Sequence, residues 1–231
     1  MFFFDPMYLL FALPGLVLAL AASFFTKSTF HKYSQVMASS GISGAQAAKR
    51  MLNFAGVNDV RIEETSGFLS DHYDPSDKTL RLSPDVFRSD SLSAIGVACH
   101  EAGHAIQHAN SYAPLMLRST MVPLTNISSS LSYFIIFGGF IFQSQGLILI
   151  GAILFSVAVL FSIVTLPVEW DASSRAKRLM VSAGIVNSNE AGDAGAVLNA
   201  AFMTYVAAAV SALLTLLYYL LRSGIFGGGD D

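Results

Sequence analysis

The 231-residue sequence has little charge and a single cysteine. Lys, Arg, Asp and Glu make up 13% of the residues, about half the share that is usual in soluble proteins. The net charge is −3 and the basic residues form no long run, so nothing favours a nucleic-acid partner. One cysteine, Cys99, excludes an intrachain disulfide and a zinc site built from cysteines. We interpret Cys99 as a buried helix residue.

Apolar residues are abundant instead, at 53% of the chain, and indicate a membrane protein. A transmembrane helix needs about 20 predominantly apolar residues. Four stretches meet that length: Met7–Phe25, Val122–Phe142, Leu147–Leu166 and Ala201–Leu221. The first contains Ala19-Leu20-Ala21, which resembles a signal-peptide cleavage site, but Asp5 precedes it and no Lys or Arg does. We therefore expect an uncleaved anchor.

The basic residues predict the orientation of these spans. Of the 13 Lys and Arg residues, nine lie between the first two spans, three between the last two, and one after the last span. The connection between the second and third spans has no charge. Because positive residues collect on the cytoplasmic side, we expect both large loops inside the cell and both termini outside.

Short helices and strands are expected between the spans. Ser43 can cap a helix that Gly56 follows, and Asp90 or Ser91 can cap a longer one. The turn-rich residues 74–77 separate two strands and predict a small β-hairpin. The expected elements are a helix at 40–54, a strand at 57–63, hairpin strands at 71–73 and 79–82, a helix from Ser91 to about Asn110, and a new or kinked helix from Pro167 to Ala183.

The longer helix carries the HExxH sequence His100-Glu101-Ala102-Gly103-His104. Residues four apart share a helix face, so both imidazoles can reach one zinc ion. Glu101 beside them can accept a proton from a zinc-activated water. Glycine inside a helix costs about 1 kcal/mol against alanine, so Gly103 predicts that another backbone packs closely there. The alternative is a pair of buried helix histidines without metal.

A zinc site normally needs a third protein ligand. The metzincin pattern is excluded because Gln107 and Asn110 stand where its glycine and third histidine would be. Glu169, just beyond the third span, is the better candidate, since an even number of crossings returns it to the side of His100. Asp171 could instead pair with Arg175 at i,i+4, as a contact on the helix surface. Both acids could also be ordinary interfacial charges.

A zinc-activated water that attacks a carbonyl group would need a further group to stabilise the oxyanion. The sequence offers His72, His108, Arg175 and Tyr205 without ranking them. An extended substrate is expected to add a strand along residues 79–82. The rival hypotheses are a non-catalytic zinc-binding scaffold or chaperone-like protein, and a four-span transporter. The transporter is disfavoured because no span has a charged residue or histidine in its interior.

Three segments resemble the YugP-like family of bacterial membrane neutral zinc metallopeptidases. They are VACHEAGHAIQH at 97–108, LPVEWDAS at 166–173 and AFMTYVA at 201–207. The resemblance implies a membrane zinc peptidase with His100 and His104 as ligands and Glu101 as catalytic acid/base. A looser similarity to HtpX-like peptidases, whose third ligand opens a Glu-x-x-Ala-Asp pattern, supports Glu169. Ser173 replaces the final Asp of that pattern. Asp171 is therefore the alternative acid that could hydrogen-bond to a metal ligand.

Together these observations predict a mainly α, multi-pass membrane protein with four transmembrane helices. A zincin-like cytoplasmic or juxtamembrane catalytic region would contain the small β-hairpin. We expect one Zn²⁺ per chain, a bacterial cell membrane location with the site on the cytoplasmic side, and a membrane-associated or unfolded peptide substrate. The expected segments are an anchor at 1–25, the catalytic region at 26–120, two spans at 121–166, the third-ligand segment at 167–200, and the last span and tail at 201–231.

Overall fold

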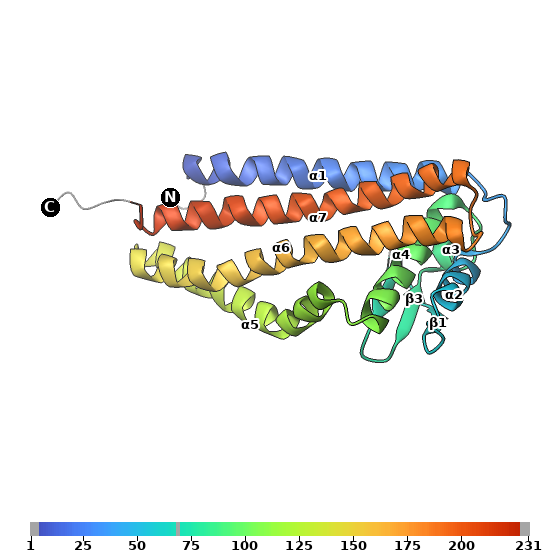
Figure 1. Ribbon diagram of the computed structural model, residues 1–231. Coiled ribbons are helices and arrows are strands. Elements are labelled where there is room, and N and C mark those ends of the chain that lie inside the picture. Colours follow the sequence, from blue (N-terminus) through green and yellow to red (C-terminus); the bar gives the residue numbers. More distant parts are fainter. Residues whose placement is uncertain (1–4, 68–69, 227–231) are drawn as a thin grey trace. The chain divides into compact units, whose positions relative to one another are not determined.

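The computed structural model describes residues 5–67 and 70–226. Helices predominate and a small sheet lies among them (Figure 1). The helices are α1 (Pro6–Ser34), α2 (Gly44–Phe54), α3 (Pro84–Phe87), α4 (Leu92–Ala109), α5 (Ala113–Ile141), α6 (Gln145–Ser182) and α7 (Ser188–Arg222). The strands are β1 (Arg61–Glu64), β2 (His72–Asp74) and β3 (Thr79–Leu82). The mainly α prediction is confirmed.

The chain divides into two compact units, which we name the span unit and the sheet unit. Among the described residues, the span unit comprises 5–22, 117–166 and 204–226. The sheet unit comprises 23–67, 70–116 and 167–203. Each unit has its own hydrophobic cluster, and the two are described separately below.

The span unit contains most of the apolar helical sequence. Four helices, α1, α5, α6 and α7, are long and apolar enough to cross a membrane. Large apolar side chains on these helices point outward: Leu10 is 71% exposed and Phe134 is 76% exposed. Its buried cluster is small and gathers around Tyr218 and Tyr219. Apolar side chains that point outward are what a lipid environment requires, so the predicted four-span character is confirmed.

In the sheet unit, local sequence signals define the helix starts. Ser43 caps α2 and forms a capping box with Gln46, in which each side chain binds the other's backbone N–H. Gly56 follows with φ +75°, a conformation that glycine adopts without strain. The Ser91 hydroxyl accepts a hydrogen bond from the Ala94 N–H and caps α4. These caps confirm the predicted helices.

The sheet has the strand order β1-β3-β2. The predicted hairpin is confirmed, because β2 pairs antiparallel with β3 in the register His72 to Arg81. β1 pairs parallel with the other side of β3, in the register Arg61 to Thr79. The prediction that a substrate adds along 79–82 is therefore wrong, since β3 is the central strand and both its edges are already paired.

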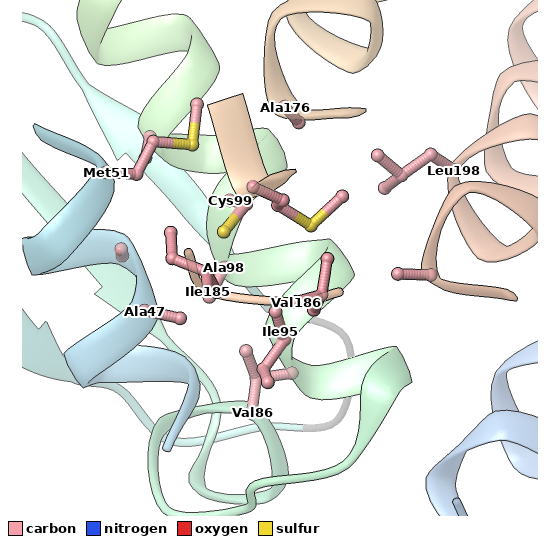
Figure 2. Packing of buried hydrophobic residues seen from close by; sticks show 14 of the residues in the cluster. Ala47, Met51, Val86, Ile95, Ala98, Cys99, Ala176, Ile185, Val186 and Leu198 are labelled. Atoms are coloured by element: carbon pink, nitrogen blue, oxygen red, sulfur yellow. The ribbon is translucent and has the colours of Figure 1, made fainter. Parts of the chain in front are cut away.

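Helix α4 lies at the centre of the sheet unit's hydrophobic core. Its side chains Ile95, Ala98 and Cys99 pack with Met51 of α2 and Val86 of α3 (Figure 2). The remaining cluster members include Leu80 and Leu82 of β3, Ala176 and Met180 of α6, and Val197 and Leu198 of α7. Because α4 is surrounded by protein, its polar residues lie in a buried environment.

Helix α6 is continuous from Gln145 to Ser182, with Pro167 inside it. Of the two alternatives predicted at Pro167, a new helix is therefore wrong, and a kinked helix stays a prediction. Proline lacks the N–H that would bind the carbonyl one turn earlier, but the helix continues beyond it. As a consequence, Glu169 and Asp171 lie within α6 rather than in a first turn.

Candidate metal centre

Three side chains from two helices of the sheet unit converge. His100 and His104 lie one turn apart on α4, and Glu169 lies on α6. Glu169 Oε2 is 3.1 Å from His100 Nε2 and 3.4 Å from His104 Nε2. One potential ligand atom from each residue lies within 4.8 Å of the other two. The structure thus brings the three predicted ligands together.

The donor set fits a single zinc ion. In a tetrahedral zinc site with bonds of about 2.0–2.1 Å, neighbouring ligand atoms lie about 3.3 Å apart. The separations of 3.1 and 3.4 Å between Glu169 Oε2 and the two imidazole nitrogens match that spacing. Two imidazoles and one carboxylate are also a ligand set that catalytic zinc sites use. The group can therefore hold one zinc ion and leave a fourth position for water.

The remaining nitrogen of each histidine has its own partner. His100 Nδ1 lies 3.1 Å from Ser173 Oγ, and His104 Nδ1 lies 3.0 Å from Gln107 Oε1. Outer hydrogen bonds of this kind orient imidazoles that bind metals. Ser173 thus occupies the place that the HtpX-like pattern gives to an acid.

Gly103 allows the two ligand-bearing helices to approach closely. A Cβ atom added at Gly103 would lie 2.7 Å from the carbonyl oxygen of Ala172 on α6. The prediction of a close backbone at Gly103 is confirmed. That approach lets the carboxylate of Glu169, only 1% exposed, reach both imidazoles.

The Glu101 carboxyl is buried on α4. Burial raises the pKa of Glu101, while His100 and His104 oppose the rise and Glu169 and Asp71 add to it. The pKa of His104 is also raised: burial lowers it, but the hydrogen bond and charge of Glu169 outweigh that effect. A carboxyl that is easier to protonate than usual suits a group that must take up a proton and release it.

Asp171 and Arg175 form the predicted i,i+4 pair on α6, through Asp171 Oδ2 and Arg175 Nε. The Arg175 guanidinium also lies over the Tyr112 ring, 5.5 Å from its centroid. Asp171 Oδ2 in addition accepts a hydrogen bond of 2.8 Å from Gln107 Nε2. Asp171 therefore connects to His104 through Gln107, and Arg175 is bound to Asp171.

The other predicted residues are engaged elsewhere or belong to the other unit. His108 Nδ1 lies 2.8 Å from the Tyr73 hydroxyl, so it connects α4 to β2. His72 is exposed, and its Nδ1 lies 2.8 Å from the Ser70 carbonyl oxygen. Tyr205 belongs to the span unit. A role for these three in stabilising an oxyanion stays a prediction.

Sequence reasoning did not assign Gln107 to the site. Gln107 is fully buried beside His104. Because its amide carries no charge, hydrogen bonds are its only polar contribution to the site. Its position three residues after His104, on the ligand face of the helix, was the available signal. A buried glutamine in an apolar helix needs a polar partner, and here that partner is a metal-site histidine.

Comparisons with known proteins agree with this geometry. Over residues 8–224 the chain matches the family described as "Putative neutral zinc metallopeptidase". It is 45% identical over 225 residues to the "Putative membrane protease YugP" of Bacillus subtilis (strain 168), covering 97% of this chain and 99% of that protein. No solved structure matches the chain. As the resemblance of its motifs predicted, the chain belongs to the YugP-like family of neutral zinc metallopeptidases.

Proposed function

We propose that this chain is a membrane-bound, zinc-dependent endopeptidase. The observation that carries the proposal is the convergence of His100 Nε2, His104 Nε2 and Glu169 Oε2 next to the buried Glu101 carboxyl. An ion pair for stability alone would not need two histidines and a carboxylate that converge, with a second buried acid beside them. A hydrolytic zinc site needs all four groups.

His100, His104 and Glu169 would hold the ion. Zinc bound by such ligands acidifies a coordinated water and polarises the scissile carbonyl. Glu101 accepts a proton from the attacking water as its oxygen bonds to the carbonyl carbon. Glu101 then delivers that proton to the amide nitrogen as the carbon–nitrogen bond breaks. The reaction yields one carboxylic acid and one amine, between which a proton passes to give a carboxylate and an ammonium group, and Glu101 returns to its starting state.

The substrate is an extended peptide segment that pairs with β2. Within the described residues β2 is an edge strand, and it is tied to α4 through Tyr73 and His108. Main-chain pairing at an edge strand accepts many sequences but requires an unfolded or flexible segment. N-methylation removes the main-chain N–H groups that such pairing uses. Peptides N-methylated at alternate positions beside the scissile bond should therefore be cleaved with a lower kcat/KM. Equal cleavage of all N-methylated peptides would exclude this mode of binding.

The site lies on the cytoplasmic side and acts on membrane-associated or unfolded segments. The charge distribution supports this orientation, because 12 of the 13 Lys and Arg residues lie in the two connections assigned to the inside. A reporter enzyme that matures only outside the cytoplasm should be active when fused after Arg222. An inactive fusion, with a cytoplasmic reporter active at the same position, would reverse the orientation.

The decisive experiment separates zinc binding from proteolysis. Glu101→Gln keeps the shape of the side chain but removes its ability to take up the proton, so it should retain zinc and lose cleavage of casein or a generic peptide. Glu63→Gln, at a partly exposed carboxylate of β1, is the matched control and should retain both. If Glu101→Gln cleaves at the wild-type rate, the mechanism is wrong. If the wild type binds zinc but cleaves nothing, the non-catalytic scaffold is the better description.

A further inference from the structure

The side chain of Gln107 has a fixed orientation in the sheet unit. Its Nε2 donates to the Val168 carbonyl oxygen and to Asp171 Oδ2, both at 2.8 Å. A backbone carbonyl can only accept hydrogen bonds. Asp171 Oδ2 also accepts from Arg175 Nε, a group that can only donate. The end of the amide that faces these two oxygens must therefore be the NH₂ group.

This orientation leaves one arrangement for His104. With the NH₂ group directed at Val168 and Asp171, the amide oxygen faces His104 Nδ1 at 3.0 Å. An amide oxygen has no proton to donate, so Nδ1 must carry the hydrogen. In a neutral ring the lone pair is then on Nε2, the atom that lies 3.4 Å from Glu169 Oε2.

We infer that Gln107 is a positioning residue that holds His104 in the single tautomer able to bind the metal through Nε2. Arg175, Asp171 and Gln107 form a directed chain of hydrogen bonds that ends at the imidazole. Gln107 is fully buried, so water does not compete for its bond to His104. Ser173 cannot do the same for His100, because a hydroxyl both donates and accepts.

Gln107 also contributes to the spacing between α4 and α6. Gln107 on α4 binds the backbone of Val168 and the side chain of Asp171 on α6, so one amide connects the two ligand-bearing helices. The same amide orients a ligand of α4 next to Glu169, the ligand of α6. A change at Gln107 therefore affects the metal without altering any ligand.

The test compares Gln107→Met with Ile106→Met. Methionine has nearly the length of glutamine but neither hydrogen-bonding group, and Ile106 is the buried neighbour in the same turn. Loss of an outer hydrogen-bonding partner typically weakens metal binding roughly 10- to 100-fold, and we expect that range for Gln107→Met by chelator competition. Ile106→Met should keep the wild-type zinc affinity.

A second measurement reports the tautomer directly. In the zinc-loaded wild type labelled with ¹⁵N-histidine, His104 should bind zinc through Nε2 and carry its proton on Nδ1. In zinc-loaded Gln107→Met the Nδ1 proton should exchange faster with water, and part of the ring should bind zinc through Nδ1 instead. A purely structural role for Gln107 would not produce this change. A wild-type His104 protonated on Nε2, or a folded Gln107→Met protein with unchanged zinc affinity, overturns the inference.

Asp171→Asn is the substitute variant for this test if Gln107→Met does not fold. An asparagine at 171 can donate as well as accept, so only the Val168 carbonyl then opposes a turn of the Gln107 amide, and the preference for one orientation weakens. We expect a mixed His104 tautomer and a zinc affinity between those of the wild type and of a ligand variant, and an unchanged tautomer with unchanged affinity would contradict the inference.

The inference rests on the proposed ligand role of His104. If His104→Ala keeps its zinc, the proposed function fails; if it loses zinc while Gln107→Met does not, only the role of Gln107 fails.

Discussion

The two units differ in which side chains they expose and which they bury beside their apolar clusters. In the span unit, large apolar residues such as Phe134 and Phe142 point outward, and the buried cluster is small. In the sheet unit, apolar residues form a large core, and Glu101, His104, Gln107 and Glu169 are buried beside it. The same residue types are thus arranged for two different solvents.

The difference shows where polar chemistry can be accommodated. A buried ion or amide is tolerated only where other polar groups satisfy it. In the sheet unit each ligand histidine has a second partner, and the Gln107 amide binds three groups. The apolar outer surface of the span unit provides no such partners and needs none in lipid.

The largest effect is expected from comparing one acid of each unit. Glu169→Ala removes a proposed zinc ligand, so zinc affinity should fall by more than the roughly 100-fold upper limit for an outer partner, and proteolysis should be lost. Asp5→Asn in the span unit alters a carboxylate bonded to the Tyr218 hydroxyl, and zinc binding should not change. Chelator competition on both purified variants checks this. Wild-type zinc affinity in Glu169→Ala would refute its role as ligand.

Core and lipid-facing apolar residues should differ in their effect on stability. Leu80→Ala creates a cavity in the sheet unit, where the side chain is fully buried, and should lower the free energy of unfolding by about 2–5 kcal/mol. Phe134→Ala alters a side chain that is 76% exposed, and the change should stay within about 0.5 kcal/mol. Denaturant titration in detergent micelles measures both. Similar losses from the two variants would show that Phe134 is packed in protein.

A smaller effect is expected from adding one methyl group at a glycine. Gly103→Ala places a Cβ 2.7 Å from the Ala172 carbonyl oxygen, so α4 and α6 must separate, at a cost of about 1–3 kcal/mol. Zinc should also dissociate faster, because Glu169 moves with α6. Gly138→Ala is the matched control in the span unit, since no described atom outside its own stretch of helix lies within 4 Å of the added Cβ. Stopped-flow transfer of zinc to a chelator compares the two, and equal rates would contradict the close approach.

Local and periodic features of the fold were predictable from the sequence. Hydropathy and length predicted four spans, and the Ser43 and Ser91 caps predicted two helix starts. HExxH predicted the face of α4 that carries two of the candidate metal ligands. Gly103 predicted a close backbone because a glycine inside a helix needs a packing reason. Each of these signals depends on residues a few positions apart.

Features that depend on distant residues were not predictable in the same way. Nothing in residues 61–64 indicates that they pair with β3 on the side opposite β2, so the sequence could not show that β3 is central. Pro167 looked like a helix start, but tertiary packing carries α6 through it. The role of Gln107 depends on oxygens 61 and 64 residues away, and no single sequence shows that they meet.

The most direct test of the metal centre is X-ray absorption at the zinc edge, on the purified wild type and on Glu169→Ala. We expect two imidazole nitrogens and carboxylate oxygen among the atoms bound to zinc in the wild type. The carboxylate contribution should be lost in Glu169→Ala. We also expect no sulfur, because Cys99 is fully buried and its burial raises the pKa of the thiol. A sulfur ligand, fewer than two imidazoles, or an unchanged spectrum in Glu169→Ala would contradict the account.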